Sequence, residues 1–75
     1  MKVDSKKEIG NLIKQARTRK NITQKYLADK CLISRNYISD IENGRYSPSV
    51  ETLVNISKIL NINLNLIKNV VNTPN

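Results

Sequence analysis

Apolar residues recur along this chain at intervals of three and four positions, and no long stretch alternates strictly between apolar and polar residues. Spacing of this kind is typical of amphipathic helices, because a half-buried strand would repeat every second residue. A first helix is predicted over about residues 6–20, where one apolar stripe is formed by Ile9, Leu12, Ile13 and Ala16. The basic residues Lys14, Arg17 and Lys20 lie off this stripe.

Two further helices are predicted where Thr23 and Ser34 each precede an apolar set at helical spacing. Their inward-facing residues are expected to be Leu27, Ala28, Cys31, Ile38 and Ile41. Ala28 is small enough to let a crossing helix approach closely, and Gly44 marks the end of the second of these helices. Two short helices joined by a tight turn can offer the polar side chains of the second to the major groove of DNA.

The C-terminal part of the chain predicts two more helices after a turn-rich linker. Pro48 stops the preceding helix and Ser49 can cap a fourth. Its broad apolar face is expected to comprise Val50, Leu53, Val54, Ile56 and Leu60. Residues 61–63 break that helix, and a short fifth helix is indicated by Leu64, Ile67, Val70 and Val71. The pattern predicts an all-α fold.

The length of 75 residues leaves room for one domain. We expect its core to cover about residues 6–68, with residues 69–75 as a terminal extension. Thirteen Lys and Arg residues against six Asp and Glu give a net charge of +7, which favours a polyanionic partner such as nucleic acid or an anionic membrane surface.

The single cysteine and the absence of histidine exclude several kinds of chemistry. One cysteine cannot form an internal disulfide, and Cys31 is expected to be a buried, reduced thiol of an intracellular protein. Without histidine, no common zinc-ligand spacing and no obvious acid–base pair remain, so we expect neither a metal, nor a cofactor, nor an enzyme. No apolar stretch approaches the roughly 20 residues of a membrane span, and no signal peptide is evident, which predicts a soluble cytoplasmic protein.

A longer string of residues carries a family resemblance over about residues 6–68. It comprises Ile9-Gly10, Thr23-Gln24, Leu27-Ala28, Tyr37-Ile38-Ser39-Asp40-Ile41-Glu42, Gly44-Arg45, Pro48-Ser49, Thr52-Leu53 and Leu60. In order and spacing it resembles the lambda-repressor and Cro-like helix-turn-helix family, also called the xenobiotic-response-element type. The resemblance implies a compact five-helix domain that binds double-stranded operator DNA, usually as a symmetric dimer, with residues 34–43 as the recognition helix.

Two positions depart from the family pattern. The family often has glycine in the turn after the second helix, where the backbone tends toward positive φ, but this chain has Leu32. Keeping that conformation would cost roughly 1 kcal/mol, and a slightly remodelled turn is the alternative. The family also often has glutamate three residues after the threonine cap of the second helix, where this chain has Tyr26.

Base recognition is expected from the exposed start of the third helix. Arg35 can fork onto guanine and Asn36 onto adenine, and Ser39 lies one turn further on, where it could reach a base or a phosphate. Asp40 suits this surface only if it orients Arg35 or accepts a hydrogen bond from cytosine. The competing interpretation is that all four are ordinary solvated helix residues.

Phosphate contacts are expected on both sides of the recognition helix, from Gln24, Tyr37, Asn43, Arg45, Ser47 and Ser49. The resemblance implies that Gln24 also braces the recognition helix. Electrostatics favours Arg45 most strongly among these phosphate contacts. Asn43 could instead cap its helix, Ser49 could act as an N-cap, and Tyr37 could simply pack against the second helix. Glu42 is interpreted as a structural ion-pair or capping partner, with Arg17 as a candidate.

The last apolar residues exceed what one short terminal helix needs for its core face. This surplus predicts a homodimer interface formed by Leu64, Leu66, Ile67, Val70 and Val71. Two alternatives are that the segment covers the monomer core, or that it continues into a longer chain. Two modules spaced by roughly 34 to 36 Å can engage successive major grooves, which favours the dimer.

The sequence thus predicts a bacterial or phage transcriptional regulator, a repressor that binds a palindromic operator as a dimer without a cofactor. The main alternative is an antitoxin or anti-repressor that uses the same fold to hold a protein partner. A basic amphipathic membrane-surface binder is disfavoured, because the apolar helix faces are needed for a shared core.

Overall fold

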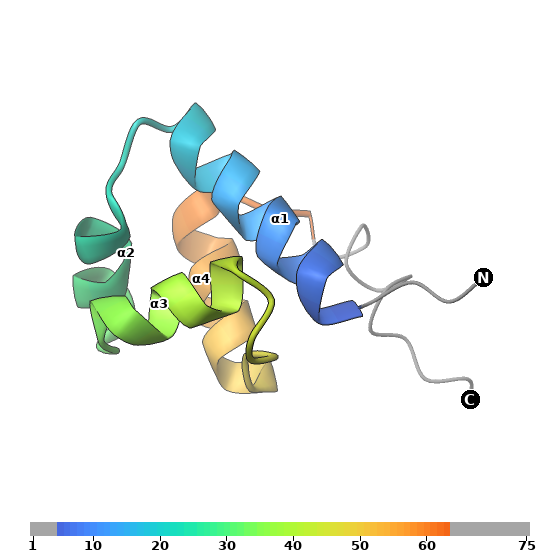
Figure 1. The fold of residues 1–75 in the computed structure, drawn as a ribbon. Helices are drawn as coiled ribbons and strands as arrows, with labels where there is room; N and C mark the ends of the chain where they lie inside the picture. The colour runs from blue at the N-terminus through green and yellow to red at the C-terminus, as the bar shows by residue number, and fades with distance from the viewer. Residues whose placement is uncertain (1–4, 64–75) are drawn as a thin grey trace.

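The computed structural model describes residues 5–63, which form four helices joined by short loops and contain no strand. The helices are α1 (Ser5–Arg19), α2 (Gln24–Cys31), α3 (Arg35–Glu42) and α4 (Val50–Leu60). α3 packs against both α1 and α2, and α4 packs against the same two helices from its own side (Figure 1). Each helix therefore packs mainly against two of the other three, and α1 and α4 also contact each other.

Each of the last three helices starts at a hydroxyl cap, as the sequence predicts. Thr23 Oγ1 accepts from the Tyr26 N–H at 3.0 Å, and Ser34 Oγ accepts from the Tyr37 N–H at 3.0 Å. Ser49 Oγ accepts from the Thr52 N–H at 3.2 Å. These bonds satisfy backbone donors that a helix start leaves without a partner, so the three helix starts are fixed by local chemistry.

The core lies where the four helices meet and consists of branched aliphatic side chains. Its largest fully buried residues are Ile9, Ile13, Leu27, Ile38, Ile41 and Ile56. Ala28 and Cys31 are buried beside them, as predicted, and burial raises the pKa of the Cys31 thiol above its ordinary value. This thiol is a packing residue in a reduced, uncharged form.

One predicted core position is wrong. Val50 was expected on the apolar face of the fourth helix, but its side chain is 80% exposed. It is the first residue of α4 and lies in the turn where the chain enters the helix, whereas Leu53, Ile56 and Leu60 face the core. Val54 is half-buried. The buried apolar face of α4 is therefore narrower than the set of apolar residues in its sequence indicates.

The predicted fifth helix, from Leu64 to Val71, lies outside the described residues. The described residues 5–63 form the four-helix core. None of the helices in this part of the chain has the length and apolar character required to cross a membrane.

Candidate nucleic-acid interface

The turn between α2 and α3 keeps the left-handed conformation although it has no glycine. Leu32 has φ 59° and ψ 40°, and the Ile33 N–H donates to the Ala28 carbonyl at 3.0 Å. The Leu32 side chain is 91% exposed. Because the left-handed region is unfavourable for a residue with a Cβ, this turn stores strain. The remodelled turn considered from the sequence is not adopted.

The angle between α1 and α3 depends on Gly10, whose packing role the sequence does not show. A Cβ at Gly10 would lie 2.3 Å from the Ile41 carbonyl oxygen and 2.8 Å from that of Glu42. The α1 backbone therefore touches the C-terminal end of α3 directly. This contact brings Glu42 within reach of side chains on α1.

Glu42 forms a buried ion pair with Arg17, as interpreted from the sequence. Arg17 Nε donates to Glu42 Oε2 at 2.6 Å and Arg17 Nη2 donates to Oε1 at 3.1 Å. A third donor, Arg17 Nη1, reaches the Ile22 carbonyl at 2.7 Å. The side chains are only 12% and 2% exposed, so water hardly competes for these bonds.

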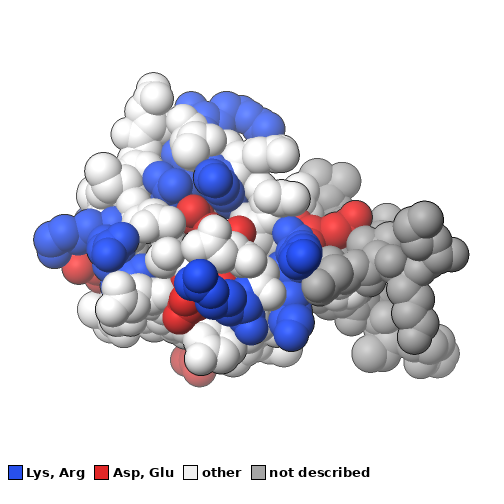
Figure 2. Space-filling view, viewed as in Figure 1, with Lys and Arg blue, Asp and Glu red and all other residues white. Residues whose placement is uncertain are grey.

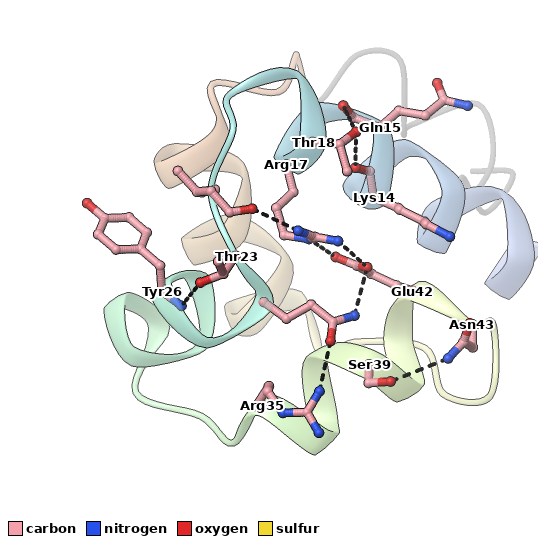
Figure 3. Close-up of polar contacts among 12 residues, drawn as sticks. Lys14, Gln15, Arg17, Thr18, Thr23, Tyr26, Arg35, Ser39, Glu42 and Asn43 are labelled. Carbon is pink, nitrogen blue, oxygen red and sulfur yellow. Dashed lines mark hydrogen bonds and ion pairs between the residues drawn. The ribbon is translucent and has the colours of Figure 1, made fainter.

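Gln24 extends this buried pair to the surface of α3. Its Nε2 donates to Glu42 Oε1 at 3.0 Å, and its Oε1 accepts from Arg35 Nη1 at 3.1 Å. A carboxylate only accepts and a guanidinium only donates, so the Gln24 amide has one orientation that satisfies both. The connected bonds run from Arg17 through Glu42 to Arg35 (Figure 3). We call these four residues, Arg17, Glu42, Gln24 and Arg35, the arginine relay.

The predicted base-contact residues lie together on α3. Arg35 and Asn36 are exposed in its first turn, and Arg35 Nη2 donates to Asn36 Oδ1 at 3.4 Å. Ser39 is half-buried one turn later, where its Oγ accepts from Asn43 Nδ2 at 3.4 Å (Figure 3). The first two side chains are thus already ordered with respect to each other.

Asp40 does not orient Arg35, one of the two roles considered from the sequence. Its Oδ1 accepts from Arg45 Nη1 at 3.0 Å instead, and the Arg45 N–H donates to the Asp40 carbonyl at 2.9 Å. The side chains of Arg45 and Asp40 are 67% and 28% exposed. A second ion pair therefore borders α3, on the solvent side.

The remaining predicted phosphate contacts flank the recognition helix. Asn43 is the C-cap of α3, and its N–H donates to the Ser39 carbonyl at 2.9 Å. Ser47 is exposed in the linker, and Ser49 is the N-cap of α4. The capping roles are thus occupied, and they leave each of these side chains at the surface.

The Tyr37 ring packs against the core and beside Tyr46. It is half-buried against the core, and its ring lies 6.5 Å from that of Tyr46 between centroids, at 57°. Tyr46 itself is exposed. The pair supports the linker beside α3.

The surface around α3 is predominantly basic. In the view of Figure 2, Lys and Arg side chains lie on several sides of the face that α3 occupies, and acidic side chains lie among them. The two acidic side chains of α3 are both paired, Glu42 with Arg17 and Asp40 with Arg45. A surface of this kind attracts phosphates through several cations at once.

A helix-turn-helix family model matches residues 13–67, which include α2, its turn and α3. The chain is 47% identical over 62 residues to the ImmF control region 10 kDa protein of Bacillus phage phi105, covering 83% of this chain and 69% of that protein. It is 41% identical over 59 residues to the immunity repressor protein of the same phage, covering 79% of this chain and 41% of the repressor.

A third relative, the HTH-type transcriptional activator BcrR of Enterococcus faecalis, is 39% identical over 57 residues. These cover 76% of this chain but 28% of the activator, so the chain spans less than half of each of these two longer relatives. The shared part includes the helix pair. The chain belongs to the lambda-repressor and Cro-like helix-turn-helix family of DNA-binding transcriptional regulators.

Proposed function

We propose that this protein represses transcription by binding a palindromic operator in double-stranded DNA as a homodimer. The observation that carries the proposal is the arginine relay, which holds an exposed guanidinium in place at the start of α3. A side chain held before binding loses less conformational entropy on contact with a base. An arginine that only makes a helix soluble does not need a network of buried hydrogen bonds to hold it.

In this proposal the first turn of α3 enters the major groove. Arg35 donates to O6 and N7 of guanine, Asn36 pairs with adenine, and Ser39 lies one turn further along the same side. Arg35 keeps further N–H donors after its bonds to Gln24 and Asn36, because a guanidinium carries five. Holding Arg35 and contacting guanine are thus compatible.

Phosphate contacts position α3 in the groove. Arg45 supplies charge on one side, with Asn43, Ser47 and Ser49 nearby in the chain, and the start of α2 at Gln24 supplies backbone N–H groups on the other. The Tyr37 hydroxyl is a further donor. These contacts fix the register of the protein without specifying sequence.

The dimer is proposed to form through the apolar residues Leu64, Leu66, Ile67, Val70 and Val71. Two copies then read two half-sites in successive major grooves, which makes the operator palindromic. Residues 1–75 act as one DNA-binding domain in this arrangement.

The role as a repressor is supported by the immunity repressor among the relatives, while the activator BcrR supports the opposite effect. A reporter gene behind a promoter that contains the selected operator separates these roles. Expression of this chain is expected to lower reporter output. An increase would make the protein an activator.

Selection of bound sites from random double-stranded DNA tests the binding proposal directly. We expect an enriched palindromic sequence with half-sites about one helical turn apart, and one dimer per site by sedimentation. Arg45→Ala should weaken binding to all sequences alike and reduce the salt dependence, because it removes a phosphate contact. Selection without any enriched sequence would contradict the proposal and favour a protein-binding role for the fold.

A further inference from the structure

Asp40 is the one acidic side chain of α3 that reaches the solvent-facing surface. The other, Glu42, is 5% exposed and has its charge matched by Arg17. Asp40 lies one helical turn after Asn36, so the two share a side of α3. Phosphates repel a carboxylate on a surface that approaches them, so the position of Asp40 needs an explanation.

Folding stability does not supply that explanation. The Asp40–Arg45 pair is exposed, and exposed ion pairs add little to stability. α3 is already held by its Ser34 cap, its buried isoleucines and the arginine relay. The carboxylate is therefore dispensable for the fold.

The geometry of the pair leaves one oxygen of Asp40 for another donor. Arg45 Nη1 bonds Oδ1, while Oδ2 has no hydrogen bond among the described residues. The backbone bond from the Arg45 N–H to the Asp40 carbonyl, at 2.9 Å, keeps Arg45 beside the carboxylate. The carboxylate thus lies beside a cation that reduces its repulsion by phosphates, and one of its oxygens is left to accept from a base.

We propose that Asp40 is a specificity-determining residue, which accepts a hydrogen bond from the exocyclic amino group of cytosine in the operator. This inference rests on the proposed DNA-binding function. Cytosine offers an amino donor in the major groove, whereas the amino group of adenine lies beside the N7 acceptor, and guanine and thymine present carbonyl oxygens; a carboxylate is repelled by N7 and by these oxygens. Asp40 therefore selects by attraction to one base and by repulsion of others, and its charge weakens binding to non-operator DNA.

The test measures the affinity of the full chain for its selected operator and for every single-base variant of one half-site. The variants are Asp40→Ala and Asp40→Asn, and Asp29→Ala is the matched control. Asp29 is an exposed carboxylate on α2 paired with Lys25, so the control removes the same charge from a different helix. Thermal melting verifies that all three variants fold.

We expect the wild-type protein to prefer cytosine at one position of the half-site by about 5- to 150-fold. Asp40→Ala should remove that preference and leave the other positions unchanged, while binding non-operator DNA more tightly. Asp40→Asn should move the preference from cytosine to adenine, because an amide can both donate and accept. Asp29→Ala should keep the wild-type preference at every position.

The experiment distinguishes failure of the proposed function from failure of the proposed role of Asp40. A wild-type protein without any base preference would overturn the proposed function together with this inference. A wild-type protein with a clear operator, whose preferences are unchanged in Asp40→Ala, would overturn the role of Asp40 alone.

Discussion

The two ion pairs of α3 use the same chemistry in opposite environments. Arg17–Glu42 is buried, with side chains 12% and 2% exposed, and it accepts a further bond from Gln24. The Asp40–Arg45 pair is exposed, because the side chain of Asp40 is 28% exposed and that of Arg45 is 67% exposed. One carboxylate oxygen of Asp40 has no partner among the described residues. The buried pair can hold α3 in one orientation, whereas the exposed pair can exchange partners when DNA arrives.

Breaking the buried pair should have the largest effect on stability. Glu42→Ala leaves the Arg17 guanidinium buried without its counter-ion and is expected to lower the free energy of unfolding by about 3 to 5 kcal/mol. Urea unfolding followed by circular dichroism measures this loss. Asp40→Ala is the matched control on the same helix and should cost under about 1 kcal/mol. Equal losses in the two variants would contradict the contrast between the pairs.

Gly10→Ala tests the close approach that brings α1 to Glu42. The added methyl would lie 2.3 Å from the Ile41 carbonyl oxygen, so the backbones must separate. We expect a net loss of about 1 to 3 kcal/mol despite the higher helix propensity of alanine. The control is Asn11→Ala, at the next and exposed position of α1, which should be neutral or stabilising in the same urea experiment. A stabilised Gly10→Ala would show that α1 does not rest on α3.

Gln24→Met tests whether the buried pair acts on base recognition through the relay. Methionine has a similar length but cannot donate to Glu42, and its sulfur is only a weak acceptor for Arg35. We expect discrimination at the guanine contacted by Arg35 to fall by about 1 to 2 kcal/mol, within the range of a single bidentate contact. Lys25→Met, at the exposed neighbouring position, serves as a control and should retain the discrimination. Unchanged discrimination in Gln24→Met would make the relay purely structural.

Leu32→Gly removes the strain in the turn that sets the angle between Gln24 and Arg35. Glycine adopts the left-handed conformation without the Cβ penalty, so the variant should be more stable by about 1 kcal/mol in thermal or urea unfolding. Leu32→Ala keeps the Cβ and the strain, and should gain little. A gain of the same size in both variants would attribute the effect to the exposed apolar side chain.

The smallest effect is expected for the exposed pair itself. A double-mutant cycle with Asp40→Ala and Arg45→Ala should give a coupling energy below about 1 kcal/mol, and it should shrink further in high salt. Urea unfolding at two salt concentrations provides the measurement. A coupling of several kcal/mol would mean that this pair, like the buried one, holds the fold together.

Local signals made most of the fold predictable. A hydroxyl residue before an apolar periodic segment specifies a helix start within a few residues of chain, and the structure has its caps at Thr23, Ser34 and Ser49. The position of Val50 was predicted wrongly, because composition does not show how far a helix face turns away from the core at its first residue.

The site was predictable only in part, because its geometry depends on contacts between distant segments. Arg35 and Asn36 were expected at the start of α3, and both are exposed there. The bonds of Gln24 and the pairing of Asp40 with Arg45 depend on how the helices cross and how the linker returns, which no local pattern specifies. Gly10 was missed as a determinant, since only the packed structure shows which backbone it touches.

In the proposed function Arg35 reads a base rather than merely adding positive charge. The decisive measurement compares the affinities of the wild-type protein and Arg35→Ala for the selected operator and for each of its single-base variants. We expect a loss of about 1 to 3 kcal/mol on the operator, with discrimination abolished at one guanine and retained elsewhere. Equal losses on every sequence would contradict it, because they would identify Arg35 as a contact to the DNA backbone.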